Sequence, residues 1–234
     1  MNTGNQGITQ RKAARIAGIA IIVMTIAAVG ANDLTINKLV VEGNAAETMK
    51  NISSSVMLFR LGIFSWFIVL VCDLLAAWGL YIFLKPVNKD LSLLMAWFRI
   101  IYVAILGASM LNLLYVLPLL DETGYSSAFG TGQVQDQVVS YVNAFFDAWS
   151  LGLVVFGLHI LFLGYLLLKS RFRVAILGIL LLIAFAGYTL INVTKLLFPQ
   201  SESFINVMNW IFLLPMLSEP VLGIWLLFTR LLKE

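Results

Sequence analysis

Four ionisable side chains lie inside long apolar stretches of the sequence, where they could hold a proton, an ion or a ligand. They are Asp73, Arg99, His159 and Glu219. An ionisable side chain in hydrocarbon costs roughly 2.5–3.5 kcal/mol on insertion scales, so each one needs a partner or a water-lined cavity. Carboxylate and histidine side chains inside membranes often carry protons or ions. These four residues are therefore our candidates for a ligand- or ion-binding site.

The spacing of three of these residues predicts that they lie at a common depth. Asp73, His159 and Glu219 come six, five and four residues before a glycine, on segments expected to run in the same direction. At about 1.5 Å of rise per residue, this places them within roughly one helical turn of each other. Arg99 lies on the segment next to that of Asp73 across a tight turn, which favours an Asp73–Arg99 pair. Glu219 and His159 are then left as a second possible pair.

A second polar group lies in the outer half of the same segments. Tyr188, Asn192 and Lys195 follow one another at i, i+4 and i+7, which places them on one face of a helix. Asn143 and Asp147 share a face of the preceding segment, so Lys195 and Asp147 could pair across a polar vestibule that would suit an anionic headgroup or a small polar ligand. The basic members can equally snorkel to the membrane interface. The vestibule candidates are Arg60, Asn143, Asp147, Tyr188, Asn192 and Lys195.

Long membrane helices are needed to position these residues. Apolar residues make up 61% of the 234-residue sequence and charged residues 12%, whereas soluble domains contain about half and about a quarter. Crossing roughly 30 Å of hydrocarbon takes about 20 apolar residues in a helix. The sequence therefore predicts an all-α, polytopic transmembrane bundle of six helices in one domain over residues 1–234, with the lipid bilayer as its partner. The six segments are residues 13–31, 57–84, 91–119, 138–168, 172–197 and 206–230.

Lysine and arginine gather on one side of the predicted bundle. The tight turns at 85–90 and 169–173 and both chain ends carry most of them, while the long polar loops at 32–56 and 120–137 carry few. This asymmetry predicts an N-in/C-in topology, with cytoplasmic termini and with the two long loops outside, where they could form a small cap. In the alternative interpretation the first segment is a signal peptide cleaved near Val29-Gly30-Ala31, which leaves five helices.

Several classes of site lack their signature in this sequence. Cys72 is the only cysteine, which excludes an intramolecular disulfide and a multi-cysteine site. His159 is the only histidine, which excludes a multi-histidine zinc site. No Gly-x-Ser-x-Gly elbow and no phosphate-binding glycine loop occurs. We therefore expect no metal, no cofactor and no enzymatic activity. The net charge of +3 lies at helix ends and indicates no nucleic-acid partner.

Short motifs along most of the chain, roughly residues 11–230, resemble a known family. They are Phe59-Arg60-Leu61-Gly62, Asp73, Arg99, and Ser218-Glu219-Pro220 before Leu222-Gly223-Ile224-Trp225-Leu226-Leu227. The resemblance is to the bacterial membrane-protein family known as domain of unknown function 4386. It implies a six- or seven-helix protein of the bacterial plasma membrane without an assigned activity, and it transfers no catalytic residue.

Three functional hypotheses follow from the buried polar residues. The first is a non-enzymatic membrane protein that binds a small or lipid-like ligand, or moves an ion or solute, through the buried polar layer. The second is a structural or regulatory membrane protein in which the same layer only ties helices together. The third and least favoured is an intramembrane enzyme acting on lipid. The sequence leaves the ligand, the helix order and the oligomeric state open.

Overall fold

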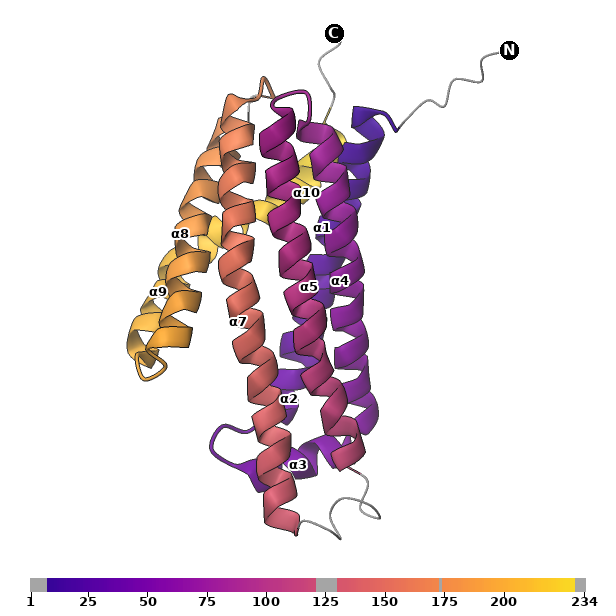
Figure 1. Ribbon diagram of the computed structural model, residues 1–234, viewed down its shortest axis with the longest axis vertical. Helices are drawn as coiled ribbons and strands as arrows, with labels where there is room; N and C mark the ends of the chain where they lie inside the picture. Colours follow the sequence, from indigo (N-terminus) through magenta and orange to yellow (C-terminus); the bar gives the residue numbers. More distant parts are fainter. Residues whose placement is uncertain (1–7, 121–129, 173, 230–234) are drawn as a thin grey trace, which may run out of the picture.

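The computed structural model describes residues 8–120, 130–172 and 174–229, which form a bundle of α-helices (Figure 1). Six helical stretches are long and apolar enough to cross a membrane, as judged by length and composition. This confirms the predicted all-α fold with six membrane spans. The stretches are α1 Gln10–Ala31 continued by η1 Asn32–Ile36 and α2 Asn37–Leu39, α4 Val56–Leu84, α5 Lys89–Leu119, α7 Thr131–Lys169, α8 Ala175–Leu197, and α9 Glu202–Met216 followed by α10 Ser218–Phe228.

Helices that follow one another in the sequence pack side by side. α4 packs on α1 and α5, α5 on α7, α7 on α8 and α8 on α9, while α10 packs mainly on α1. The short turns between α4 and α5 and between α7 and α8 thus join antiparallel neighbours. The turn at residues 85–88 ends at Asn88, whose side chain accepts a hydrogen bond from the Leu91 N–H (2.9 Å) and so caps α5. α1 begins and α10 ends at one end of the bundle, which we call the terminal end; the opposite end is the far end (Figure 1).

The helix α7 extends beyond the thickness of a membrane at the far end. Its 39 residues span about 58 Å at 1.5 Å per residue, against roughly 30 Å of hydrocarbon. The predicted loop at 120–137 is therefore partly wrong, because α7 already begins at Thr131; residues 121–129 lie outside the described part of the chain. Val134 and Val138 are fully buried one turn apart, which explains why this polar stretch is helical.

The predicted loop at 32–56 is also mostly helical. α1 continues through η1 into α2, and the short helix α3 (Ala45–Ser54) packs against α7. The Thr48 hydroxyl accepts a hydrogen bond from the Val41 N–H (2.9 Å) and donates one to the Val41 carbonyl (3.2 Å). Thr48 and Ile52, one turn apart, are fully buried. The segment thus forms a helical cap on the far end, as the sequence suggested for the long loops.

The last membrane stretch, predicted as one helix over 206–230, is broken into α9 and α10 at Leu217. Pro220 has no N–H to donate to the carbonyl of Met216, and its ring would clash with that carbonyl in a continuous helix. α9 consequently lies along α8, whereas α10 turns away and crosses to α1 (Figure 1). Glu219 lies in the first turn of α10. The break therefore carries this carboxylate from the edge of the bundle to its centre.

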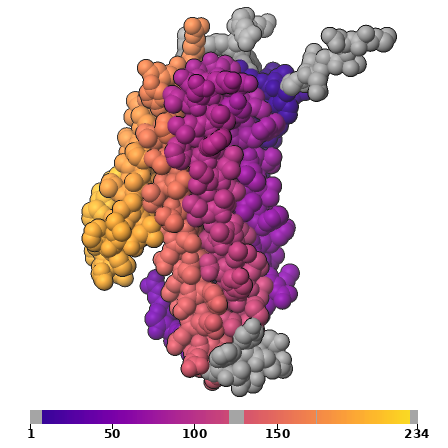
Figure 2. Space-filling view, in the orientation of Figure 1, coloured from indigo at the N-terminus to yellow at the C-terminus, as the bar shows by residue number. Residues whose placement is uncertain are grey.

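The α8–α9 hairpin stands off from the rest of the molecule at its free end. Figure 2 shows the surface hollowed between this hairpin, coloured orange to yellow, and the purple segment near the far end. Within the described residues α9 does not pack extensively on α1, although α10 packs closely on it. The bundle is therefore closed toward the terminal end and more open in its far half.

Candidate functional site

Arg99 occupies the centre of the bundle and contacts the other three buried ionisable residues. Its Nε and Nη2 donate to Asp73 Oδ1 at 2.8 and 2.5 Å, and its Nη1 donates to Glu219 Oε1 at 2.6 Å. The same Nη1 lies 3.0 Å from His159 Nε2. We call Asp73, Arg99, His159 and Glu219 the charge cluster. The structure brings together residues from α4, α5, α7 and α10 that the sequence had placed at one depth.

The hydrogen bonds of His159 determine its tautomer. A guanidinium only donates, so His159 Nε2 must accept from Arg99 and carries no proton. His159 Nδ1 lies 3.0 Å from the carbonyl oxygen of Met95, which only accepts, so Nδ1 carries the proton. His159 is therefore neutral in this arrangement. The predicted Glu219–His159 pair is wrong, because both residues bind Arg99 and, among the described residues, no hydrogen bond joins them directly.

All five N–H groups of the Arg99 guanidinium have a partner. Four of them bind the charge cluster: two donate to Asp73, one to Glu219 and one to His159. The fifth, on Nη2, donates to the Met24 sulfur on α1 at 3.1 Å. The centroid of the Phe156 ring lies 5.3 Å from the guanidinium carbon, within the range of a cation–π contact. Arg99 itself is 0% exposed. A buried arginine is stable only when fully paired in this way.

Sequence reasoning missed two partners of Arg99. Phe156 precedes His159 by three residues on α7, so helical spacing places both on one face, and this signal could have found it. Met24 lies in a run of apolar residues with no feature that marks it. Its role depends on the close approach of α1 to α4 and α10.

The charge cluster contains more carboxylates than cations. One guanidinium faces two carboxylates and a neutral imidazole, so one negative charge is left over when both carboxylates are ionised. Asp73 Oδ2 and Glu219 Oε2 make no hydrogen bond within the described residues. Neither oxygen is completely enclosed by the protein. Both oxygens therefore remain available to a ligand.

Asp73 and Glu219 form the floor of an inner cavity of about 320 Å³. The cavity is bordered by five aromatic side chains and by part of α1. Of the residues that the structure describes, no lysine, arginine or histidine lines it. The aromatic residues are Trp66, Tyr102, Trp149, Phe156 and Tyr188.

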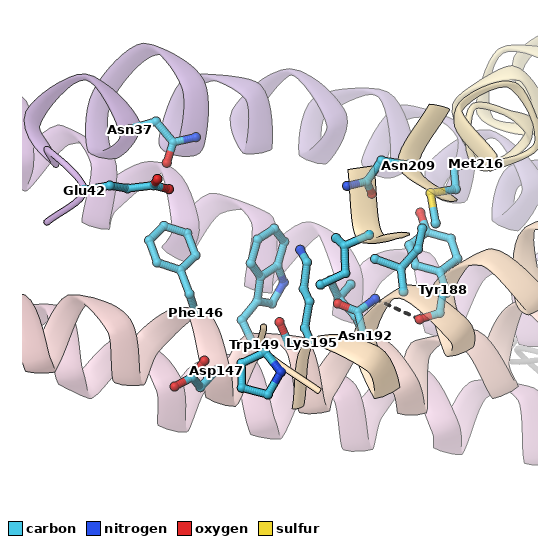
Figure 3. A pocket seen from close by; sticks show the side chains of 15 residues that line it. Asn37, Glu42, Phe146, Asp147, Trp149, Tyr188, Asn192, Lys195, Asn209 and Met216 are labelled. Atoms are coloured by element: carbon cyan, nitrogen blue, oxygen red, sulfur yellow. Dashed lines mark hydrogen bonds between the residues drawn. The ribbon is translucent and has the colours of Figure 1, made fainter. Parts of the chain in front are cut away.

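A second, outer cavity of about 510 Å³ lies between α7, α8 and α9 toward the far end. Figure 3 shows the Lys195 side chain extending into it beside Trp149, and the hydrogen bond that the Asn192 amide donates to the Tyr188 carbonyl. The structure thus brings Tyr188, Asn192 and Lys195 of the predicted helix face to one cavity. Four residues line both the inner and the outer cavity, namely Trp149, Leu153, Tyr188 and Met216.

Three details of the predicted vestibule are wrong. Asp147 borders the outer cavity, but its carboxylate is directed away from Lys195 (Figure 3), and among the described residues no ion pair joins the two. Asn143 is exposed and borders neither cavity. Arg60 is exposed on α4 and lines a separate apolar recess with Phe64 and Met110, as expected for an arginine that snorkels at the membrane surface.

Two buried polar atoms beside the cavities have no partner. The Trp66 indole N–H and Asn192 Oδ1 are enclosed without a hydrogen bond, although such a group costs about 1–3 kcal/mol when left unpaired. Trp66 lines the inner cavity and Asn192 the outer one. In the described part of the chain, no three His, Cys, Asp or Glu side chains are close enough to hold a metal ion.

Comparisons with known proteins agree with the membrane fold and give no activity. The family model described as "Domain of unknown function (DUF4386)" matches residues 16–229. An "Uncharacterized protein" from Archaeoglobus fulgidus is 31% identical over 122 residues, which cover 52% of this chain and 59% of that protein. No solved structure matches the chain. Because the family model covers nearly the whole sequence, this multi-span membrane protein belongs to the DUF4386 family.

Proposed function

We propose that the protein binds a small or lipid-like ligand in the inner cavity and is not an enzyme. The observation that carries this proposal is the placement of two carboxylates, each with an unpaired oxygen, at the floor of a cavity inside the bundle. Charged groups inside a membrane protein normally face a partner, a cavity or a substrate path. Here Arg99 satisfies one oxygen of each carboxylate and leaves the other free.

In this proposal the two adjacent cavities form the route by which a ligand passes from the far end to the charge cluster. The outer cavity is polar at its margin, with Lys195, Asn209 and Glu42 on three separate segments. The inner cavity has the volume of about ten water molecules, at the lower end of the range for small-molecule sites. The side chains common to both cavities, Leu153 and Met216 among them, stand between the two.

Leu153→Trp is expected to block this route. The indole would occupy the space between the cavities, whereas Leu151→Trp places the same bulk on the exposed face of α7 and serves as the control. Thermal unfolding in nanodiscs is measured with benzylammonium, benzyl alcohol or benzoate, three probes of similar size. At about 100 times its Kd, a ligand stabilises a protein by about 2.7 kcal/mol. At least one probe should raise the Tm of the wild type and of Leu151→Trp but not of Leu153→Trp. The proposal fails if no probe does so.

We further propose that the termini are cytoplasmic and that the outer cavity opens to the outside of a plasma membrane; a bacterial source stays a prediction. The excess of lysine and arginine at the terminal end supports this orientation. In a Cys72→Ser background, Ser150→Cys in the outer cavity and Ser53→Cys on α3 should react with an impermeant thiol reagent added to intact cells. Ser170→Cys, at the terminal end, should react only after permeabilisation. The reverse labelling pattern would invert the proposed topology.

A structural role of the charge cluster is the second candidate function. The complete pairing of the Arg99 donors favours it, because such a network holds α1, α4, α5, α7 and α10 in register. On this hypothesis Glu219→Gln lowers the Tm and does not change probe binding. On the ligand-binding hypothesis the same substitution changes binding.

A further inference from the structure

The electrostatics of the inner cavity favour a positively charged ligand. Among residues 8–120, 130–172 and 174–229, its lining includes two carboxylates and no basic side chain. Arg99 lies behind those carboxylates, is completely buried and has no free N–H to offer. When both carboxylates are ionised, an anion would meet uncompensated negative charge, and a neutral ligand would leave that charge unbalanced. A cation at the free oxygens of Asp73 and Glu219 would neutralise it.

The walls of the cavity suit an organic rather than a bare inorganic cation. Trp66 and Trp149 pack edge to face with ring centroids 4.8 Å apart, and Phe156 and Tyr188 pack in the same way at 5.2 Å. Aromatic side chains bind ammonium groups through their ring faces and bury the attached hydrocarbon. A metal ion would instead require several oxygen ligands arranged around it, which these walls do not provide.

Trp66 has an unpartnered donor beside the cavity. Trp66 is 1% exposed, and its indole N–H has no hydrogen-bond acceptor in the described part of the chain. Trp66 lines the same cavity as Asp73 and Glu219. Because this nitrogen is fully enclosed, a ligand in the cavity does not reach it in this arrangement.

Resting on the proposed ligand-binding function, we propose that the inner cavity selects an organic ammonium ion. Its ammonium group binds Asp73 Oδ2 and Glu219 Oε2, and its apolar part lies among Trp66, Trp149 and Phe156. The ammonium group thereby supplies the positive charge that Arg99 alone does not provide for two carboxylates.

The ammonium group can come from a free amine or from a lipid headgroup. The outer cavity offers the route for a free amine through the residues that it shares with the inner one. Val29, which is 48% exposed on the outer face of α1, also borders the inner cavity. Val29 thus lies both at the surface of the bundle and at the cavity, and a headgroup would approach the cavity beside it.

The test compares three probes that differ in charge and little in size. Wild-type protein in phosphatidylglycerol nanodiscs is titrated with benzylammonium, benzyl alcohol and benzoate, and empty nanodiscs give the background. Benzylammonium should bind more tightly than the other two. Glu219→Gln and Asp73→Asn should each weaken benzylammonium binding by roughly tenfold or more, because each removes a charge in contact with the ligand. Benzyl alcohol binding should stay within about twofold in both variants.

Glu202→Gln is the matched control for Glu219→Gln. Glu202 lies in the first turn of α9, as Glu219 does in α10, but it is exposed and borders neither cavity. Its substitution should leave all three affinities unchanged. The Tm of each variant without probe is measured in parallel. The affinities are then compared at a temperature at which every variant is folded.

A second set of nanodiscs distinguishes the sources of the ammonium group. Half of the phosphatidylglycerol is replaced by phosphatidylethanolamine, and benzylammonium is titrated again. A lower apparent affinity in the wild type indicates that the headgroup competes for the site, and an unchanged affinity indicates a free amine. Tighter binding of benzyl alcohol or benzoate, or unchanged benzylammonium affinity in both carboxylate variants, would overturn the cation proposal and leave ligand binding intact. Binding of no probe would remove both proposals.

Discussion

Replacing Arg99 with glutamine should lower the free energy of unfolding by about 3–5 kcal/mol, the loss typical of a buried ion pair that loses one partner. Arg99 is the only cation among the hydrogen-bonded groups of the charge cluster. Without it, Asp73 and Glu219 face each other across a neutral histidine, and Met24 loses its donor. The measurement is unfolding of the purified protein by SDS titration in mixed micelles, read from helical circular dichroism.

Two further variants separate charge from shape in this prediction. Arg60→Gln removes an exposed arginine from α4 and should change stability by no more than about 0.5 kcal/mol. The triple variant Arg99→Gln, Asp73→Asn, Glu219→Gln removes every charge from the cluster and should recover a large part of the loss, because no buried charge is then unpaired. Equal stability of Arg99→Gln and the triple variant would show that the charges are not coupled.

Gly18→Ala should destabilise the bundle by about 1–3 kcal/mol, the usual cost of overpacking. A Cβ at Gly18 would lie 2.7 Å from the carbonyl oxygen of Gly223, a backbone atom of α10 that cannot move alone. α10 would have to shift away from α1, and Glu219 would shift with it. The same SDS titration should show lower stability, and the benzylammonium affinity should fall as well.

Gly30→Ala is the control on the same helix. A Cβ at Gly30 meets no atom within 4 Å, and alanine is better than glycine in a helix by about 1 kcal/mol. This variant should be as stable as the wild type or more stable. If Gly18→Ala behaved in the same way, the close packing of α1 and α10 would be contradicted.

The sequence predicted the charge cluster because burial of charge imposes strict conditions. Asp73, Arg99, His159 and Glu219 stand out from apolar surroundings, and helical rise converts their positions into depths. The depth argument succeeded although the last helix is broken, because Glu219 and Gly223 both belong to α10. The family resemblance also came from residues of this cluster and was confirmed by the family match.

The arrangement around the axis of the bundle could not be predicted in the same way. The depth of a residue can be estimated from its own segment alone. Which helices pack against each other depends on all the helices together. Arg60 therefore entered the vestibule hypothesis on depth alone and proved to be exposed on α4, beside a separate apolar recess. Pro220 accounts for the break in the last segment, but the sequence does not indicate that α10 crosses to α1.

The short turn between α4 and α5 has a consequence for how the chain enters the bilayer. Asp73 and Arg99 lie on the two arms of one hairpin and can be inserted together as an electrically neutral unit, which avoids much of the cost of inserting either charge alone. Glu219 is synthesised more than a hundred residues later. It arrives after its binding partner is already in place, so the final step of membrane integration completes the acidic side of the cluster.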